Sequence, residues 1–172
     1  MTVLEKNASS FLVENINLLP KGRVLDIAMG EGRNAVYLAS LGFKVEGIDI
    51  SEEAIKIAEK TARQSGVDIS AHVVDLEENA YIAKDSYDVI ICFNYLQRSL
   101  IKHIKAGLRK GGIIVYETYI IDQIHFGKPR NPDFLLKHNE LLDMFSDFRC
   151  LIYHEGIMEN RKAVAGIIAQ KI

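Results

Sequence analysis

Apolar and polar residues alternate along this chain with two distinct periods. Short runs that are almost continuously apolar predict buried strands, and longer stretches with an apolar residue at every third or fourth position predict helices. Strands are expected over residues 23–28, 43–50, 68–74, 87–93, 113–119, 148–155 and 163–169. Helices are expected over residues 9–19, 34–41, 51–65, 95–108 and 134–145. Residues 120–133 are mostly polar and contain Pro129 and Pro132, which predicts a loop.

The regular succession of strands and helices argues for an α/β fold built on a mostly parallel sheet of seven strands. The run 87–93 is apolar almost throughout, as a central strand buried on both faces should be. Residues 156–162 make a short connection between the last two strands, so these strands are expected to form a C-terminal antiparallel pair. No linker or repeat divides the chain, which predicts a single domain over residues 1–172 with its N-terminal segment, 1–20, packed on it as a helix.

Composition narrows the class of protein. The chain has 172 residues, 48% of them hydrophobic, and a net charge of −2, as in ordinary globular proteins. It has no basic face for nucleic acid, no signal-like N-terminus and no apolar run long enough to cross a membrane, so a cytoplasmic protein, monomeric or homodimeric, is expected. Cys92 and Cys150 both lie in apolar runs and are expected to be buried, and the histidines show no metal-ligand spacing.

The segment from Arg23 to Ala35 combines a strand, a turn with two glycines and the start of a helix. Gly30 and Gly32 lack the Cβ atoms that would keep a ligand away from the backbone. Ligands of parallel sheets bind beyond the carboxyl ends of the strands, where this turn is placed. Gly30-x-Gly32-x-x-Ala35 also satisfies the general dinucleotide-binding pattern, which alone is weak evidence.

Three acidic residues stand at the ends of the first three predicted strands: Asp26, Asp49 and Asp75. A carboxylate such as Asp49 is a strong acceptor for the two hydroxyl groups of a ribose. Three carboxylates would repel a pyrophosphate, whereas a cationic nucleoside would be attracted. The pattern therefore favours S-adenosylmethionine, with its sulfonium and ammonium groups, as the cofactor. A nicotinamide-dependent oxidoreductase is the alternative from another class, and it would need a second half-sheet.

Five motifs in order carry a resemblance to a known family: residues 24–34, 47–51, 74–76, 87–91 and 108–112. With these motifs the chain resembles the class I S-adenosylmethionine-dependent methyltransferases. The Gly32-Arg33-Asn34 ending of the first motif makes it most similar to the tellurite-resistance-type small-molecule methyltransferases. The resemblance implies a Rossmann-like, doubly wound sheet and an enzyme that transfers a methyl group.

The resemblance also implies which residues bind the cofactor. The implied set is Asp26, Ala28, Gly30, Gly32, Asn34, Asp49, Ile50, Asp75, Leu76, Phe93 and Asn94. In it the glycines pass under the methionine part, Asp49 binds the ribose and Asp75 accepts from the adenine amino group. Ala28 stands where the family has glycine, and its small methyl group is expected to leave cofactor binding intact. If it does not, the chain is a catalytically degenerate module.

The methyl acceptor is expected to be a small molecule: an oxyanion, a thiol, a phenol or a quinone-like compound. The chain lacks the Pro-Pro pair that amino-group methyltransferases of this superfamily carry after strand four. Transfer would be an in-line displacement, in which alignment and exclusion of water are the main levers. The substrate-side candidates are Tyr95, Arg98, Tyr119, His125 and Arg130, with Glu117, Thr118, Gln123 and Lys128 near them. Arg98 and Arg130 are suited to clamp an anion, and His125 to act as a base.

Overall fold

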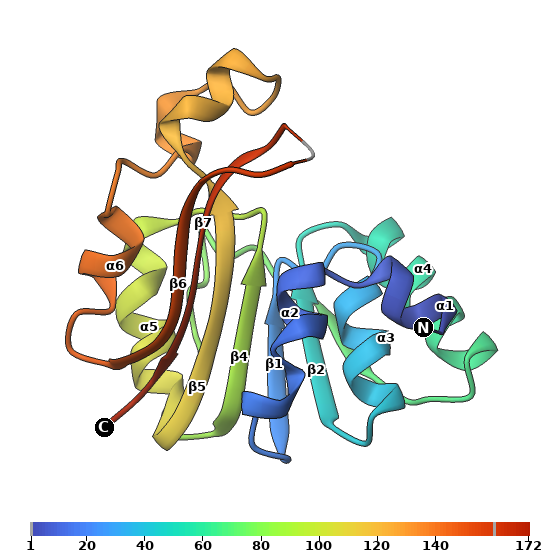
Figure 1. The fold of residues 1–172 in the computed structure, drawn as a ribbon. Coiled ribbons are helices and arrows are strands. Elements are labelled where there is room, and N and C mark those ends of the chain that lie inside the picture. Colours follow the sequence, from blue (N-terminus) through green and yellow to red (C-terminus); the bar gives the residue numbers. More distant parts are fainter. Residues whose placement is uncertain (1, 160) are drawn as a thin grey trace.

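We describe residues 2–159 and 161–172 of a computed structural model of the chain. Within these residues, seven strands form one sheet in the order β3-β2-β1-β4-β5-β7-β6 (Figure 1). The strands are β1 (Arg23–Ile27), β2 (Lys44–Asp49), β3 (Ser70–Val73), β4 (Tyr87–Phe93), β5 (Leu108–Tyr119), β6 (Arg149–Ile157) and β7 (Ala163–Gln170). The first five pair in parallel, and β7 runs antiparallel to both β5 and β6. This confirms the predicted fold class, including the C-terminal antiparallel pair.

The strand order reverses between β1 and β4. The chain builds outward from β1 to β2 and β3, returns to β4 beside β1, and continues outward to β5. At such a reversal the connections leave β1 and β4 in opposite directions, which opens a crevice beyond their carboxyl ends. Ala28 and Asn94 are the first residues past the two strands, so they stand at the entrance of that crevice.

Helices cover both faces of the sheet (Figure 1). They are α1 (Val3–Asn7), α2 (Ser10–Glu14), α3 (Arg33–Ser40), α4 (Glu52–Gln64), α5 (Ile101–Gly107) and α6 (Glu140–Met144), with short 3-10 turns η1 (Ile16–Leu18), η2 (Arg98–Leu100), η3 (Ile121–His125) and η4 (Pro132–Phe134). One apolar cluster lies under α2, α3 and α4, and the other lies under α5 and α6. Strand β4 is apolar along most of its length because it contributes to both clusters. In the described residues no helix has the length and apolar character needed to cross a membrane.

Two predicted helices are much shorter than expected. The helix predicted from 95 begins only at Arg98 with η2, because Asn94 has a left-handed backbone (φ 56°) and the Tyr95 carbonyl accepts a hydrogen bond from the Tyr116 hydroxyl (2.8 Å). The helix predicted over 134–145 is reduced to α6. Leu136 instead extends alongside the end of β5, where its N–H donates to the Tyr119 carbonyl (2.9 Å). Its apolar side chain is thus buried by an extended segment.

Two smaller expectations also fail. The single helix expected over residues 9–19 is α2 followed by η1, and α1 precedes it with Thr2 as a side-chain cap. Cys92 is buried as expected, but Cys150 is exposed. Cys150 lies on β6, which is the last strand of the sheet, and the residues of this edge strand are exposed or only partly buried.

Candidate active site

Left-handed backbone conformations gather at the carboxyl ends of β1 and β4. Ala28 (φ 52°) and Asn94 (φ 56°) adopt them at the two strand ends, and Gly30 (φ 58°) and Gly32 (φ 76°) adopt them in the turn after β1. A left-handed conformation costs an alanine roughly 1–2 kcal/mol, while glycine takes it freely and asparagine tolerates it. The fold therefore bends the chain sharply at both strand ends, which leaves space between them.

That space is a cavity of about 450 Å³, which we call the central cavity. It is lined by Asp26, Ala28, Met29, Gly30, Glu31, Arg33, Asn34, Phe93, Asn94, Tyr95 and Lys162. Six of the eleven residues that the sequence assigned to the cofactor lie in this lining. They are Asp26, Ala28, Gly30, Asn34, Phe93 and Asn94.

Asp26 is the least satisfied polar group of the central cavity. Its side chain is buried, and Oδ2 has no hydrogen-bond partner among the described residues. Burial raises the pKa of Asp26 to about 8; the nearby Arg33 charge acts in the opposite direction, and Asp49 adds to the rise. The carboxyl group is therefore neutral at pH 7 until a cation or a donor reaches Oδ2.

The two glycines of the turn have different tasks. A Cβ atom on Gly30 would meet no other atom within 4 Å, so it would project into open space at the cavity. A Cβ atom on Gly32 would lie 2.7 Å from the Cβ atom of Ala58 in α4. Gly32 is thus needed for packing of the turn against α4, whereas Gly30 leaves space free for a ligand.

The other predicted cofactor residues continue along the carboxyl edge. Asp49 Oδ2 accepts from the Gly30 N–H (2.7 Å), and Asp49 Oδ1 accepts from the Ser51 N–H (2.9 Å). Ile50 is a large apolar side chain with 65% of its surface exposed. Asp75, at the end of β3, accepts from the Glu77 N–H (2.9 Å), and Leu76 beside it is buried. Each carboxylate still has lone pairs for ligand hydroxyl or amino groups.

A second cavity, of about 600 Å³, opens beside the central one and shares Asn94 and Tyr95 with it. We call it the aromatic cavity. Its lining consists of Glu77, Asn94, Tyr95, Leu96, Gln97, Tyr119, Lys128, Pro129, Arg130, Asn131 and Phe134. Three of the predicted substrate-side residues, Tyr95, Tyr119 and Arg130, therefore come together, and Lys128 and Phe134 join them.

Tyr95 is a neutral wall of the aromatic cavity. Burial raises the pKa of Tyr95 to about 12, and nearby Cys92 and acidic groups add to the effect. Its hydroxyl donates to Gln97 Oε1 (2.7 Å). At neutral pH the side chain is therefore a hydrogen-bond donor and an apolar surface, and not a proton acceptor.

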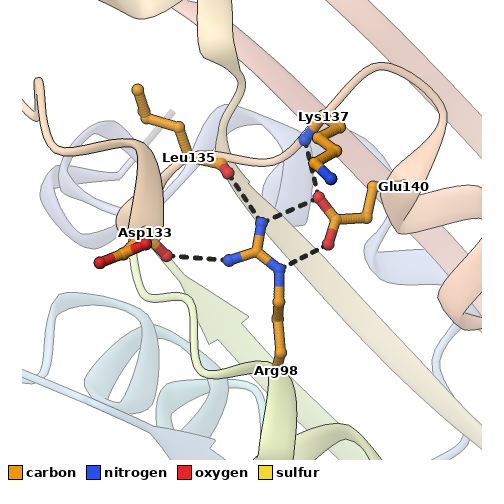
Figure 2. Close-up of polar contacts among 5 residues, drawn as sticks. All are labelled: Arg98, Asp133, Leu135, Lys137 and Glu140. Atoms are coloured by element: carbon orange, nitrogen blue, oxygen red, sulfur yellow. Dashed lines mark hydrogen bonds and ion pairs between the residues drawn. The ribbon is translucent and has the colours of Figure 1, made fainter.

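Arg98 does not clamp a ligand (Figure 2). Its Nε donates to Glu140 Oε1 (2.6 Å) and its Nη2 to Glu140 Oε2 (2.9 Å). The guanidinium also donates to the carbonyl oxygens of Asp133 and Leu135, each at 2.9 Å. These bonds tie the segment that carries Lys128–Phe134 to the start of α5. Arg98 thus positions one wall of the aromatic cavity, and the anion clamp predicted from the sequence loses one of its two arms.

Two other predicted residues lie away from the cavities. His125 is exposed at the end of η3 and does not line the central or the aromatic cavity. Gln123 is buried and structural, because its Oε1 accepts from the Ala163 N–H (2.8 Å) and its Nε2 donates to the Lys128 carbonyl (3.1 Å). Thr118 is buried as well.

A third cavity, of about 560 Å³, borders the central cavity on another side, and we call it the polar cavity. It is lined by Ala8, Ser9, Ser10, Phe11, Glu14, Arg33, Asn94, Glu117, His154, Met158, Glu159, Lys162 and Val164. The sequence did not point to His154. The one signal available was Gly166, an isolated glycine in an apolar strand, which indicates a close approach of another group.

A cavity of about 680 Å³ lies at the opposite edge of the sheet, around Phe43, Gly66 and Ser70. It is larger than the other three, but it lies by the amino ends of the parallel strands, where sheets of this kind do not bind their ligands. We therefore place the candidate site at the carboxyl edge.

Several known proteins are similar to this chain in sequence. A sequence profile described as "Methyltransferase domain" matches residues 24–112. The chain is 29% identical over 159 residues to the "Probable S-adenosyl-L-methionine-dependent methyltransferase TehB" of Haemophilus influenzae. That alignment covers 88% of this chain and 54% of the relative. It is 31% identical over 113 residues to the "Ubiquinone biosynthesis O-methyltransferase" of Bordetella bronchiseptica, at 63% and 47% coverage. The chain spans about half the length of these curated relatives.

Solved structures share the architecture. The crystal structure of TehB from Haemophilus influenzae superposes with a TM-score of 0.82 and 26% identity, covering 96% of this chain and 63% of that one. A structure of S-adenosylmethionine-dependent methyltransferases from Methanosarcina mazei gives a TM-score of 0.72 at 21% identity, covering 96% and 99%. At 21% identity, the similarity to the Methanosarcina mazei structure shows a shared fold only.

Replacing Arg98 with lysine should loosen the wall of the aromatic cavity. Lysine keeps the charge but cannot make the two-pronged bond to Glu140 or reach both carbonyl oxygens. We expect amide hydrogen exchange over residues 126–139 to rise about tenfold, with exchange in β1 and β4 unchanged. Arg109→Lys is the matched control, because Arg109 forms a comparable exposed pair with Asp88 elsewhere. Equal exchange in both variants would show that Arg98 does not hold this segment.

Proposed function

The chain belongs to the methyltransferase-domain family, whose class I S-adenosylmethionine-dependent members share its fold, and from this premise we propose that it transfers the cofactor's methyl group to a small-molecule acceptor. The observation that carries the proposal is the shared lining of two cavities. The central cavity, which we propose holds the cofactor, is joined through Asn94 and Tyr95 to a second cavity of suitable size for a small molecule.

The residues of the central cavity fit S-adenosylmethionine. The unpaired Oδ2 atom of Asp26 is a buried acceptor that a cationic ligand can satisfy. Gly30 leaves open space where a side chain would otherwise stand. In the proposed mode, Asp49 binds the ribose, Ile50 covers the adenine and Asp75 accepts from its amino group. The cofactor supplies a methyl group on a positively charged sulfur.

The aromatic cavity suggests the chemistry of the acceptor. Tyr95, Tyr119 and Phe134 offer ring surfaces, while Lys128 and Arg130 offer positive charge. Together they suit a planar phenol or quinone-like compound that carries an acidic group. Oxyanions and thiols are the other classes, and they would use the two cations but little of the aromatic surface.

The protein's contribution would be alignment and desolvation. A bound cofactor would supply the methyl group, and the residues lining the two cavities would hold the acceptor's nucleophilic atom in line with it and keep water away. Walls that fix the acceptor's position can supply roughly 7–11 kcal/mol of the barrier reduction. Asn94, which lines both cavities, would stand beside the reacting atoms.

Cofactor affinity should depend on pH through Asp26. The carboxyl group is protonated below about pH 8 in the free protein, and a bound cation favours its ionised form. Binding therefore releases a proton, and we expect affinity to rise between about pH 6 and pH 8, by up to tenfold per unit. Calorimetric titrations in two buffers of different ionisation enthalpy measure the proton release. The Asp26→Asn variant should bind S-adenosylmethionine more weakly, and its affinity should no longer rise with pH through residue 26. Any pH dependence that is left should come from the amino group of the ligand.

The same shift predicts a stability change. Because the pKa of Asp26 lies above the usual carboxyl value of 3.8, the folded state loses stability as the pH rises from that value to about 8. The amide of the Asp26→Asn variant does not titrate, so this variant should melt at a higher temperature than the parent at pH 8 and show less difference near pH 4. A parent that gains stability over this pH range would contradict the assignment.

Gly30→Ala should weaken cofactor binding while the protein still folds. The new methyl group enters the central cavity, and the left-handed backbone adds a cost of about 1–2 kcal/mol. Gly66→Ala is the matched control, since Gly66 has a similar φ (68°) and open surroundings but lies outside the cavity. Both variants should lose similar stability, and only Gly30→Ala should bind S-adenosylmethionine at least about tenfold more weakly.

An acceptor panel tests the proposed function. We would measure S-adenosylhomocysteine release with hydroxybenzoates, catechol, a small thiol, selenite and tellurite. We expect the anionic phenols to react best, and Arg130→Gln to raise their KM about tenfold without changing the KM for catechol. Cofactor binding without turnover of any acceptor would favour the degenerate binding module, and binding of NADH alone would overturn the proposal.

A further inference from the structure

Glu117 and His154 meet across an intervening strand. Glu117 of β5 lies opposite Gly166 of β7, and Gly166 lies opposite His154 of β6. The two side chains approach each other over the glycine, with His154 Nε2 at an ion-pair distance of 3.0 Å from Glu117 Oε2; the alignment is not that of a hydrogen bond, so the buried Nε2 atom has no hydrogen-bond partner among the described residues. The side chains of His154 and Glu117 are 29% and 21% exposed, so solvent screens the pair only in part.

Gly166 is what allows this approach. A Cβ atom at Gly166 would overlap with His154 Nε2 and would lie 3.1 Å from Phe11 Cε1. Any other residue would therefore displace the imidazole. The Phe11 ring of α2 stacks on the imidazole, with ring centroids 4.6 Å apart and planes 17° from parallel. The ring of His154 is thus packed against Gly166 and Phe11, and His154 is part of the lining of the polar cavity.

The pair lies directly beside the strand end where the two cavities of the proposed function meet. The Glu117 carbonyl accepts from the Asn94 N–H (2.9 Å), and Asn94 lines all three cavities at the carboxyl edge. The polar cavity also shares Arg33 and Lys162 with the central cavity. Asn94 is the residue that the aromatic cavity and the polar cavity have in common.

The structure assigns His154, oriented by Glu117, as the group that accepts the proton of the acceptor's nucleophilic atom. This inference rests on the proposed methyl transfer. Glu117 is the positioning residue: its carboxylate faces Nε2, which favours the hydrogen on that nitrogen and leaves Nδ1 to receive the proton. His154 lines the polar cavity and not the aromatic cavity, so the proton would pass beside Asn94, which lines both, and reach Nδ1 through water.

The step balances without another reactant. The acceptor's oxygen or sulfur forms a bond to the methyl carbon, the bond from that carbon to the sulfonium breaks, and the leaving sulfur keeps the electron pair. The proton of the nucleophile passes to His154, whose positive charge is then compensated by Glu117. The partly exposed imidazole returns the proton to solvent after product release.

Other candidate bases fit less well. Tyr95 keeps its proton because burial raises its pKa to about 12, and His125 lies outside the three cavities. Among the described residues that line these three cavities, His154 is the only one that is a histidine. The charged groups that line the polar cavity together with His154 are Glu14 of α2, Arg33 of α3, Glu117 of β5, and Glu159 and Lys162 of the β6–β7 connection.

Kinetics with two kinds of nucleophile test the assignment. With a phenol, which must lose a proton, His154→Gln should lower kcat about 100-fold and leave the KM for the cofactor unchanged. With iodide, which carries no proton, the same variant should react as fast as the parent. His103→Gln on α5 is the matched control. Parent and His154→Gln enzymes with equal kcat on the phenol would overturn the assignment.

Two further variants separate orientation from proton transfer. Glu117→Gln keeps the shape of the side chain but removes its charge, so kcat on the phenol should fall about tenfold with cofactor KM unchanged. Gly166→Ala should reproduce the loss seen in His154→Gln, because its methyl group displaces the imidazole. In the parent, kcat on the phenol should fall on acidification, and this fall should be absent in His154→Gln. A parent profile retained in His154→Gln would speak against the pair.

A measurement without turnover decides the place of the pair if no acceptor reacts. The ring chemical shifts of His154 can be followed by NMR in the S-adenosylmethionine and S-adenosylhomocysteine complexes at one fixed pH. Because the two ligands differ by the sulfonium charge, the His154 signals should differ between the two complexes while the His103 signals stay the same. Equal His154 signals would place His154 away from the reacting sulfur and sink the inference, whereas a silent acceptor panel with shifted His154 signals would count against the proposed function alone.

Discussion

The carboxyl edge of the sheet depends on one buried carboxyl group that lacks a complete set of partners. Asp26 lies on the central strand β1, between β2 and β4, and its Oδ2 atom has no partner among the described residues beside the central cavity. Burying such a group in its charged form is expensive, so the protein holds it protonated and neutral. A cation in the cavity reverses this balance, because the ionised carboxylate then has a partner. The site is therefore built to prefer a positively charged ligand before any ligand contact is made.

The bends at the ends of β1 and β4 also cost conformational free energy, and they lie at the same edge of the sheet as Asp26. Ala28 and Asn94 hold left-handed conformations that strands do not need for their own stability. They turn the chain away from the sheet at once and so keep the crevice open between two adjacent strands. Asn94 thereby comes to line all three cavities. Strain and unsatisfied polarity coincide at the strand reversal, where the topology places a binding site.

Features that depend on residues close together in the sequence could be predicted, whereas features that depend on residues far apart in the sequence could not. The strands and the turn at Gly30 are local patterns, so the fold and much of the central cavity could be predicted. Leu136 is apolar at helical spacing, yet it is buried by a long-range pairing with the end of β5 that no local pattern reveals. The Glu117–His154 pair arises from the register of three strands, two of them antiparallel to the third, and it joins residues far apart in sequence. Only Gly166 hinted at it.

Arg98 and His154 show why residue type alone does not decide a role. Arg98 is a typical anion ligand, but its donors already bond to Glu140 and to two backbone carbonyls, so its charge serves to hold a wall. His154 lies at ion-pair distance from Glu117 and lines a cavity that adjoins the central cavity. A charged side chain whose bonds are complete stabilises structure. A titratable side chain that is packed on one side and borders a cavity on the other can exchange a proton. Gly166 of β7, which lies between β5 and β6, leaves the space for this arrangement at His154.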